Sequence, residues 1–583
     1  MALKQDVADE LEAYANLLDA DGVEYKPNVY RRAVESVREY PGALEALADE
    51  GEDALMELDD VGEAIASKIV EFHETGAIEE LEEMRERYPV DMRALLRVEG
   101  VGPKTVGTLY EELGVTDLDE LEAAAEADRI QEVKGFGAKT EGNILENVPF
   151  AREAGQRELL GDARPVAERV RAWVSDLDAV DEAEAAGSVR RWRATIGDVD
   201  VLAASERGQA VVDAFADWEA ADSVIEAGEQ KASVWMDGMR VDLRVVVPNE
   251  FGSALQYFTG SKDHNVKLRN YAIEHGVKLN EYGAFDVSDV VDAEDGQRVG
   301  ERIGGETEAS MYDALDLPLV PPELREGRGE VEAAVDDDLP TLLTEADVRG
   351  DLHTHTDASD GAFSVREMVE GAKSFGHEFV AVTDHAVGPG VVGGMGVPDD
   401  DLLDLAAEVE AVTDDVDGIT ALSGVEANVD ADGGISVADD VLAELDVVVA
   451  SPHSKLDMPG DEATDRLCAA MTHPSVDVLG HPTGRLLNQR EGLDVDANRL
   501  AEVAASEGVA LEVNANPSRL DLSGSSVQAA VEAGATVSIN TDAHRPASYA
   551  NVTYGVHTAR RGWAEPDDVL NTYDEDALRE FLH

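Results

Sequence analysis

Three aspartates of this sequence stand in two short segments that alternate apolar and polar residues, as β-strands do. Asp198 and Asp200 lie two positions apart in ATIGDVDVLAA, and Asp242 lies in RVDLRVVV. Residues i and i+2 of a strand point to the same face, so Asp198 and Asp200 meet on one side, and a neighbouring strand would add Asp242. Oxygen ligands of this kind suit Mg²⁺ or Mn²⁺, and two such ions support phosphoryl transfer. The pattern predicts a two-metal site, with solvated surface aspartates as the alternative.

A second candidate metal site is spread over the C-terminal third of the chain. Nine of the 13 histidines fall between residues 353 and 557, and most of them follow short apolar runs such as FVAVTDH and DVVVASPH. These runs alternate with helical patterns, which predicts βα units whose side chains converge at the C-terminal ends of the strands. Imidazoles with shared carboxylates suit Zn²⁺, Mn²⁺ or Fe²⁺. The candidate ligands are His353, His355, Asp360, His385, Glu426, His453, His481, Asp542 and His544, while His377, His473 and His557 are predicted to be structural.

A turn pattern that could hold phosphates recurs three times in the N-terminal 150 residues, which otherwise read as helices. The copies lie at 58–72, 96–110 and 133–145, and each is a short glycine-containing turn that opens into a helix. Helix N-termini attract anions and glycine permits close approach, so the pattern resembles the helix-hairpin-helix motif, a sequence-independent DNA binder. The first copy has Asp60 in place of the first glycine, and plain αα-hairpin turns are the alternative. The residues predicted to contact DNA are Gly100, Gly102, Lys104, Gly135, Gly137 and Lys139.

The net charge is the strongest compositional signal. There are 125 acidic residues against 47 basic ones, which gives −78, and 43% of the residues are hydrophobic. The acidic residues are spread through segments with good apolar periodicity, so they do not read as a disordered tail. We expect a folded protein adapted to a cytosol of multimolar salt, where the screening length is about 3 Å or less. Nucleic acid remains a compatible partner if backbone amides, metals and a few arginines bind it.

Other sequence features argue against a membrane and against an oxidising compartment. No apolar run approaches the roughly 18–20 residues of a membrane span, and the acidic, polar N-terminus is unlike a signal peptide. The single cysteine, Cys468, cannot form an internal disulfide, which fits a reducing cytosol and excludes thiolate zinc clusters. We expect a cytoplasmic, nucleoid-associated protein with no membrane partner.

Residues 187–283 resemble the nucleotidyltransferase palm and adjoining segment of family X DNA polymerases. The resemblance rests on GSVRR, on GDVD and VDLR around the three aspartates, and on YFTGSKDHNVKLRNYAIEHGVKLNEYG at 257–283. It implies that Asp198 and Asp200 bind both metals of a polymerase and that Asp242 binds the catalytic one. It further implies nucleotide contacts by Gly187, Ser188, Arg190, Arg191, Tyr257, Phe258, Gly260 and Asn265, and a template or primer contact by Arg269.

Lys68, in the helix after the first hairpin, matches the lysine with which this family forms a Schiff base to remove a 5′-deoxyribose phosphate. Such a lysine needs a lowered pKa, and no sequence feature shows one. The alternative is a surface lysine whose stem covers apolar side chains.

Residues 349–583 resemble the PHP (polymerase and histidinol phosphatase) domain, a distorted (β/α)7 barrel with a trinuclear metal site. All the ligand positions of that family are filled here, and such a site orients and hydrolyses a phosphodiester. Arg485, in HPTGRLL, is the predicted phosphate clamp. The resemblance implies one metal at His353, His355, Glu426 and Asp542, a second at Glu426, His453 and His481, and a third at Asp360, His385 and His544.

The whole chain therefore resembles bacterial and archaeal family X DNA polymerases fused to a C-terminal PHP domain, and its acidity suggests a haloarchaeal member. We expect an all-α helix-hairpin-helix region, an α+β palm with a thumb, and an α/β barrel. The expected domains are a DNA-end-binding domain with the first hairpin at 1–90, fingers with the other two at 91–155, the palm at 156–248, the thumb at 249–320, a linker at 321–346 and a PHP phosphoesterase domain at 347–583.

The expected function is DNA-directed DNA synthesis that fills short gaps in base excision repair and end repair, with a 3′–5′ exonuclease in the PHP domain. Its partners would be gapped or nicked double-stranded DNA and deoxynucleoside triphosphates, and we expect a monomer. In one alternative, a PHP nuclease or phosphatase is the main activity and the polymerase half holds DNA ends. In another, the protein is a small-molecule phosphatase of the histidinol phosphate type that carries a nucleic-acid-binding module.

The acidic composition predicts an unusual salt dependence. Salt normally weakens DNA binding steeply, but here it also screens the repulsion between DNA and a chain of charge −78. We expect extension of gapped DNA to rise with KCl to an optimum near or above about 0.5 M. Primer extension measured from about 0.05 to about 3 M KCl checks this. A steady fall from the lowest salt, with the protein still folded by circular dichroism, would contradict it.

Overall fold

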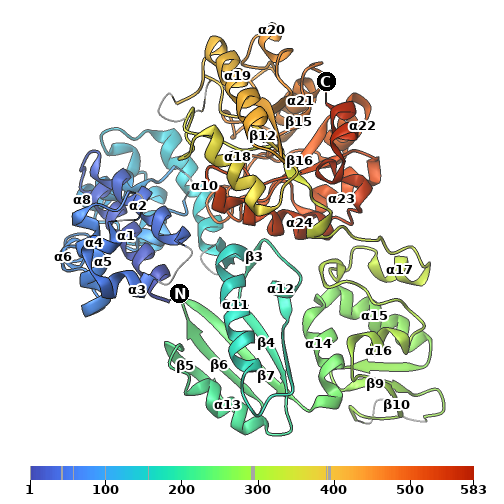
Figure 1. The fold of residues 1–583 in the computed structure, drawn as a ribbon. Coiled ribbons are helices and arrows are strands. Elements are labelled where there is room, and N and C mark those ends of the chain that lie inside the picture. Colours follow the sequence, from blue (N-terminus) through green and yellow to red (C-terminus); the bar gives the residue numbers. More distant parts are fainter. Residues whose placement is uncertain are drawn as a thin grey trace. The chain divides into compact units, whose positions relative to one another are not determined.

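The structure, a computed structural model, describes residues 2–582 except for 41–43, 57, 59, 99, 155–156, 291–295, 389 and 391–394. The described residues form two compact units, a helical one within residues 1–156 and a larger one that holds most of residues 157–583. Figure 1 shows their elements, coloured along the chain. None of the described helices is long and apolar enough to cross a membrane.

The helical unit has two hydrophobic cores. Buried side chains between Val7 and Tyr88 form the first core, and those between Leu95 and Ala151 form the second. Val90 and Met92 pack against both cores, and the domain border between residues 90 and 91 stays a prediction. The helices are α1 (Ala2–Ala20), α2 (Lys26–Glu39), α3 (Leu44–Glu50), α4 (Glu52–Leu55), α5 (Glu63–Thr75), α6 (Glu79–Arg87), α7 (Met92–Leu95), α8 (Pro103–Leu113), α9 (Leu118–Glu126), η1 (Ile130–Glu132) and α10 (Ala138–Ala154).

The larger unit begins with a mixed sheet, the palm sheet, of strand order β2-β4-β7-β6-β5. Strands β4 and β7 are parallel, and the other neighbours are antiparallel. Val199, Val201 and Ala203 of β4 belong to the core that α11 and α13 cover, so Asp200 points to the opposite face. The elements are β1 (Glu158–Leu159), α11 (Leu160–Ser175), β2 (Glu182–Ala185), α12 (Gly187–Arg190), β3 (Thr195–Ile196), β4 (Val199–Ala204), α13 (Gly208–Ala216), β5 (Ser223–Ala227), β6 (Lys231–Met236) and β7 (Met239–Val246).

A strand already stands between helix α11 and the segments that carry the three aspartates. Helix α11 ends at Ser175, and β2 follows as an edge strand of the palm sheet. Ala183 and Ala185 of β2 are buried in the core, so their alternation with glutamates is that of a half-exposed strand.

The next part of the unit, the thumb, surrounds a three-stranded antiparallel sheet of order β10-β9-β8. Helices α15 and α16 contribute Leu268, Ala272 and Met311 to its core. Its elements are η2 (Pro248–Glu250), α14 (Phe251–Thr259), α15 (Lys262–Glu274), β8 (Val277–Asn280), β9 (Gly283–Asp286), β10 (Glu301–Gly304) and α16 (Glu308–Asp313).

The segment 321–346 is packed, although its sequence suggests a linker. It contains η3 (Pro322–Leu324), α17 (Glu330–Val335) and η4 (Glu345–Asp347). The Arg325 side chain is fully buried; its Nε donates to the carbonyl of Val320 at 2.9 Å, and its guanidinium pairs with Glu308. The acidic run VDDDLP at 335–340 is typical of a linker, but it covers only the end of α17 and the turn after it.

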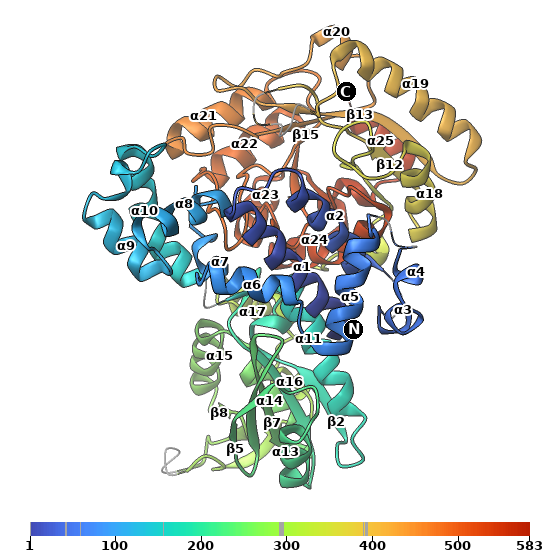
Figure 2. The ribbon, with the colours of Figure 1, turned by 90° about the vertical axis from the view of Figure 1, so that its left-hand side faces the viewer.

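The C-terminal part is a barrel of seven parallel strands in sequence order, β11 to β17. A parallel bridge between Thr354 and Ala543 joins the chain just beyond the first and last strands, and helices lie around the outside (Figures 1 and 2). The expected (β/α)7 barrel is confirmed. The elements are β11 (Gly350–Asp351), α18 (Val365–Phe375), β12 (Phe379–Val382), α19 (Asp399–Asp415), β13 (Thr420–Asn428), α20 (Asp439–Leu442), β14 (Val447–Ser451), α21 (Gly460–Met471), β15 (Val478–Leu479), α22 (Ala497–Glu507), β16 (Ala510–Asn514), α23 (Gly524–Ala533), β17 (Val537–Asn540), η6 (Pro546–Asn551), α24 (Val552–Arg561), η7 (Pro566–Asp568), η8 (Leu570–Thr572) and α25 (Glu575–Phe581).

Helix α24 joins the barrel to the palm and to the segment after the thumb. The Trp192 ring stacks on the ring of His557, with centroids 3.6 Å apart. Glu323 binds His557 Nδ1 at 2.8 Å and accepts a hydrogen bond from Arg560 Nε at 2.7 Å. Burial opposes ionisation of Glu323, but these partners outweigh it and lower its pKa to about 2. Leu520 of the barrel also belongs to the core of the palm, so these parts pack as one unit.

His377 gives the fold a pH dependence of its own. The side chain is buried against Tyr549 and Phe375, and its Nε2 has no partner among the described residues. Burial lowers its pKa to about 4, below the value of about 6.5 in an unfolded chain. The stability due to neutral His377 is therefore complete above about pH 6.5 and is lost as the pH falls towards 4. We expect His377→Phe to remove about 2 kcal/mol of the destabilisation between pH 7 and pH 5.

Denaturant unfolding of both proteins at the two pH values measures this difference. The exposed His275 supplies a matched control, and His275→Phe should leave the pH dependence as it is in the wild type. Equal pH dependence in wild type and His377→Phe would contradict the assignment.

Candidate metal centres

The three aspartates of the palm sheet meet at one point. In the parallel pair β4 and β7, Asp200 lies directly opposite Asp242, and Asp198 comes just before β4. Each of the three offers a carboxylate oxygen, and these oxygens all lie within 4.8 Å of one another. The strand periodicity places them there, because the apolar residues between them face the core.

The electrostatics of this carboxylate cluster call for cations. Burial, reinforced by the charges of Asp198 and Asp242, raises the pKa of Asp200 to about 7. Burial also disfavours charge on Asp242, but hydrogen bonds from Arg240 and Ser233 and the charge of Lys231 lower its pKa overall. Arg240 holds Asp242 through two contacts of 2.8 and 3.1 Å, and Lys231 lies 3.1 Å away. All the ligand atoms of this cluster are oxygens, and the pKa of one carboxyl group, Asp200, lies close to 7. Such a set fits Mg²⁺ or Mn²⁺.

The turn at Gly187 fits closely against this cluster. Gly187 has φ +62°, and a Cβ on it would lie 2.2 Å from Oδ2 of Asp200, so a side chain is excluded on both counts. The amide of Ala186 donates to the carbonyl of Asp200 at 2.8 Å. The turn is therefore fixed to β4, with Ser188 next in sequence at the start of α12.

Arg190 and Arg191, which the sequence assigns to a triphosphate, are paired inside the protein. Arg190 binds Glu308 through two contacts of 2.8 and 2.7 Å. Arg191 is buried; its Nε lies 3.0 Å from Glu326, and Nη1 donates to the carbonyl of Thr259 at 2.6 Å. A triphosphate would have to replace these carboxylates, so nucleotide binding by the two arginines stays a prediction.

A cleft of about 320 Å³ brings together residues that the sequence assigns to the nucleotide and the template. Tyr257, Asn265 and Arg269 line it, on α14 and α15. The amide of Asn265 donates to the carbonyls of Tyr257 at 2.7 Å and Gly260 at 3.2 Å, and so holds the turn between the helices. Phe258 lies outside this lining, with its ring at right angles to that of Tyr257 and under the guanidinium of Arg244.

The nine predicted ligands of the C-terminal part converge at one end of the barrel. His353 and His355 follow β11, His385 follows β12, His453 follows β14 and His481 follows β15. Glu426 lies near the end of β13, and Asp542 and His544 follow β17. Only Asp360 comes from a loop further along the chain. The strand-end placement expected from the apolar runs is therefore what the structure shows.

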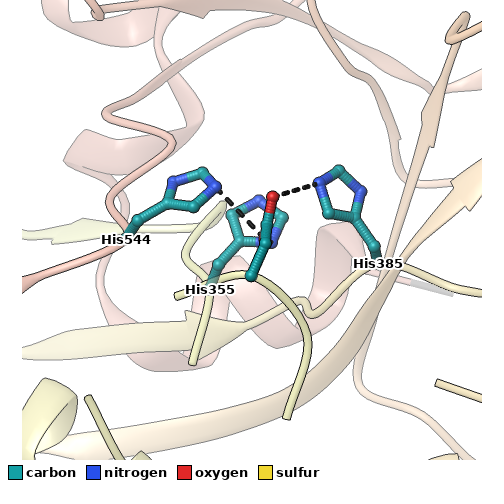
Figure 3. Close-up of side chains that lie close together, drawn as sticks. His355, His385 and His544 are labelled. Carbon is teal, nitrogen blue, oxygen red and sulfur yellow. Dashed lines mark ion pairs between the residues drawn. The ribbon is translucent and has the colours of Figure 1, made fainter. Parts of the chain in front are cut away.

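The side chains of this cluster, which we call the barrel centre, contact one another closely. Figure 3 shows the rings of His355, His385 and His544 around one space. Asp360 lies 3.3 Å from both His385 and His544. Glu426 lies 3.0 Å from His453 and 2.9 Å from His481. His355 lies 3.1 Å from Asp542.

His385 differs from the expected grouping, in which it shares a metal with Asp360 and His544 alone. Its Nδ1 lies 2.6 Å from Glu426, while its Nε2 faces Asp360. The ring therefore stands between two of the three expected metal positions, and the division of ligands among the metals stays a prediction.

Several buried polar atoms of the barrel centre make no well-directed hydrogen bond among the described residues, although some of them lie close to a carboxylate. They are His353 Nε2, both ring nitrogens of His355, His385 Nδ1, His481 Nδ1 and Glu426 Oε2. Such atoms are costly when buried, unless cations bind them. Burial opposes charge on His385 and His544, but nearby carboxylates raise their pKa values to about 11 and about 9. The donor set fits divalent metals, whose binding would displace these protons.

Two buried residues that the sequence reasoning missed orient the ligands. The carboxylate of Glu512 on β16 contacts three groups: its oxygens lie 2.8 Å from His353 Nδ1, 2.6 Å from the amide nitrogen of His481 and 2.9 Å from Nδ2 of Asn540. Asn428 Oδ1 lies 2.7 Å from His453 Nδ1. Because Nδ1 of His353 and Nδ1 of His453 are engaged in this way, the Nε2 atom of each ring is left for a metal. The signal that could have revealed Glu512 is that it is the single charged residue within the run VALEVNAN.

Arg485 is hydrogen-bonded to the backbone of a neighbouring loop, and its role as a phosphate clamp stays a prediction. Its guanidinium donates to the carbonyls of Arg519 at 2.8 Å and Leu520. Arg519 is the arginine that reaches the centre, with Nε 3.7 Å from Asp542. Arg485 therefore supports the loop that carries Arg519.

The three hairpins of the helical unit share one backbone hydrogen bond and a positive φ at the same position. In each, an amide bonds back three residues, from Val61 to Leu58, from Val101 to Val98 and from Phe136 to Val133. Asp60 has φ +55° and takes the place of the left-handed glycines at 100 and 135, as aspartate can do in turns. The unusual first copy is thus a hairpin of the same type.

The second glycine of each hairpin is not required by the protein itself. Gly102 has an ordinary φ of −88°, and a Cβ on Gly102 or Gly137 would meet nothing within 4 Å. The missing side chains leave the N-termini of α8 and α10 open to an outside group, which supports the predicted phosphate contacts there.

Lys68 is buried, contrary to the surface alternative. Its Nζ lies 3.0 Å from Glu80 and 5.3 Å from the ring centre of Tyr14. It therefore sits within the helical unit in an ion pair, and a Schiff-base role stays a prediction.

Comparisons with known proteins agree with this architecture. Residues 3–78 match the model of a helix-hairpin-helix domain, and residues 92–147 match that of a SAM-like helix-hairpin-helix tandem. Residues 254–326 match the DNA polymerase beta thumb, and residues 351–516 match the PHP domain. Asp542 and His544 lie beyond the matched PHP residues, yet the structure brings them into the barrel centre.

Fold and sites thus define a family X DNA polymerase with a PHP domain. A Bacillus subtilis (strain 168) protein named DNA polymerase/3'-5' exonuclease PolX is 35% identical over 583 residues, 99% of each chain. The chain therefore belongs to the PolX family. A probable phosphatase of Caldanaerobacter subterraneus subsp. tengcongensis is 30% identical over 207 residues, which cover 33% of this chain and 75% of the relative. A probable phosphatase of Shewanella sp. (strain MR-4) is 32% identical over 204 residues, with the same coverage.

The contact between Glu512 and His353 generates a test of metal binding. Glu512→Gln keeps the size of the side chain but loses the charge that holds the proton on His353 Nδ1. We expect the affinity for Mn²⁺ to fall about 10- to 100-fold, the usual cost of losing such a partner. Titration of the metal-free protein with Mn²⁺ measures it. The exposed Glu507 gives the control Glu507→Gln, and equal affinities in both variants would contradict the role of Glu512.

Proposed function

We propose that the protein is a DNA-directed DNA polymerase that fills short gaps in DNA repair and degrades DNA 3′ ends in its barrel centre. The observation that carries the proposal is that one chain holds two separate clusters of side chains that could bind metal ions. One is the aspartate cluster of the palm sheet, and the other is the barrel centre. Full-length similarity to a protein named DNA polymerase/3'-5' exonuclease supports both activities.

At the palm sheet, the protein positions charge for nucleotidyl transfer. Bound Mg²⁺ or Mn²⁺ would supply Lewis acidity at Asp198, Asp200 and Asp242. Of the three aspartates, Asp242 is the one on β7, the strand next to β6. The family resemblance implies that it faces the primer 3′-hydroxyl. Asp200, with a pKa raised to about 7 by burial and its neighbours, gains most from a bound cation. The cleft at Tyr257, Asn265 and Arg269 would take the nucleotide and template.

At the barrel centre, the protein holds a phosphodiester for hydrolysis. Bound Mn²⁺, Zn²⁺ or Fe²⁺ would supply Lewis acidity there. Glu512 and Asn428 fix the orientation of His353 and His453, and Arg519 is placed beside Asp542 to bind a phosphate oxygen. A 3′-phosphatase or an apurinic-site endonuclease activity would use the same groups.

The wider biological setting is part of the proposal. From the family resemblance we infer that the substrates are deoxynucleoside triphosphates and gapped or nicked double-stranded DNA. We also infer a role in base excision repair and a monomeric state. A cytosol of high salt follows from the charge of −78.

A phosphatase acting on small molecules is the second candidate, because relatives named probable phosphatases match the barrel. Those relatives cover about a third of the chain, and they leave the hairpins, the palm sheet and the thumb without a role. Assays on gapped DNA and on histidinol phosphate separate the two candidates.

Point variants should separate the two activities. We expect Asp200→Ala to reduce primer extension on gapped DNA by at least about a thousandfold, or about 4 kcal/mol, because the aspartate cluster loses its central member. The 3′–5′ exonuclease should be retained. We expect His353→Ala to do the reverse, because the barrel centre loses a ligand.

Both activities are measured on labelled DNA with Mg²⁺ and with Mn²⁺. Asp217→Ala and His473→Ala, at positions outside both centres, are the matched controls. Normal extension by Asp200→Ala would overturn the palm assignment, and undiminished degradation by His353→Ala would show that the nuclease lies elsewhere.

A further inference from the structure

A cavity of about 210 Å³ lies between the palm and the barrel, and four arginines line it. We call it the arginine cavity. Arg193 comes from the palm, Arg328 from the segment after the thumb, and Arg485 and Arg561 from the barrel. None of the described residues that line it is acidic. In a chain with 125 acidic and 47 basic residues, this is a local reversal of charge.

The positive charge of the arginine cavity is only partly compensated. Glu326 is shared among three arginines: Arg561 is 3.0 Å away, Arg193 is 3.3 Å away, and Arg191 binds it as well. The other compensating carboxylates are Asp521 near Arg485 and Glu330 near Arg328, and Glu330 also pairs with His264. Burial, together with the charges of Arg328 and Arg193, lowers the pKa of Arg561 to about 10. The guanidinium groups therefore repel one another, and an anion between them would relieve that repulsion.

Neutral donors add to the arginines. Ser523, Gly524 and Ser525, at the N-terminus of α23, line the cavity. The first amides of a helix have no acceptor within the helix and attract anions. Nε of Arg328 is buried and has no partner among the described residues. Guanidinium, hydroxyl and amide donors thus converge on one space, which is the donor set that binds phosphate.

The arginine cavity is built for a phosphate rather than for a base. Trp192 is the aromatic residue that lines it, and both faces of its ring are covered. His557 stacks on one face at 3.6 Å, and the guanidinium of Arg164 lies 4.2 Å from the ring centre. A base would find no free aromatic face there, so recognition would be independent of sequence.

The walls of the arginine cavity are continuous with both metal centres along the chain. Thr195 lines it and stands three residues before Asp198. Arg485 stands four residues after His481. Leu520 lines it and adjoins Arg519, whose guanidinium reaches Asp542 of the barrel centre. A phosphate held in the cavity is therefore one loop away from the barrel centre.

We propose that the arginine cavity binds a phosphodiester of single-stranded DNA, a few nucleotides from the 3′ end that enters the barrel centre. The cavity would thus hold a strand in reach of both halves of the protein. This inference rests on the proposed nuclease function. The same donors would also bind free phosphate or pyrophosphate, so the experiment must distinguish these anions from a phosphate group of DNA.

The test compares full-length wild type with Arg193→Ala, Ser525→Asp and the double variant. Arg193 and Ser525 are both exposed, so neither change disturbs a core. Arg366→Ala and Ser506→Asp are controls at equally exposed positions of the barrel. Binding of a 5′-fluorescein-labelled dT oligonucleotide is measured by anisotropy in EDTA, over a range of KCl and with inorganic pyrophosphate as competitor. Hydrolysis of the p-nitrophenyl ester of thymidine monophosphate reports on the barrel centre itself.

We expect the double variant to bind the oligonucleotide at least about tenfold more weakly, with a salt slope smaller by about 0.7, the value for one lost phosphate contact on a single strand. Ester hydrolysis should match the wild type, and KM for 3′-tailed DNA should rise. Equal oligonucleotide binding in all variants would overturn the proposal, as would a loss confined to pyrophosphate competition. A wild type that binds the oligonucleotide but degrades no DNA would refute the nuclease function, while the binding data would still decide the cavity.

Discussion

The structure depends on holding ionisable side chains close together and away from water. Asp200 stands beside two other carboxylates, and the barrel centre packs six histidines and three carboxylates into one end of a barrel. Desolvation disfavours charge in both arrangements, and repulsion between the carboxylates adds to it in the palm cluster. The stability of the surrounding cores is what keeps them in place, and the result is a pair of preorganised sites with a high demand for divalent cations.

The two centres follow from one geometric rule applied to different sheets. In the palm sheet, alternate residues face the core, and register aligns Asp200 with Asp242 across two parallel strands. In the barrel, parallel strands all end at the same rim, so residues far apart in sequence become neighbours. Both centres are therefore set by backbone hydrogen bonding, and the ligands need no long side chains to meet.

The sequence predicted which side chains come together better than it predicted their surroundings. Asp242 and His481 were found because strand periodicity and strand ends are visible in a sequence. Glu512 was missed because its role depends on which strand lies next to which. The pairing of Arg190 with Glu308 joins residues 118 positions apart, and no local pattern reports it. The buried Arg325 was hidden in the same way, by an acidic run that suggested a linker.

The stacking of Trp192 on His557 has a practical meaning for anyone who wishes to study the halves separately. A truncated protein that ends before the barrel would expose that ring and the palm core around Leu520. It would also leave the buried Glu323 without His557 and Arg560. An exposed apolar surface and an uncompensated charge would then appear together, so truncation would change solubility and folding as well as activity.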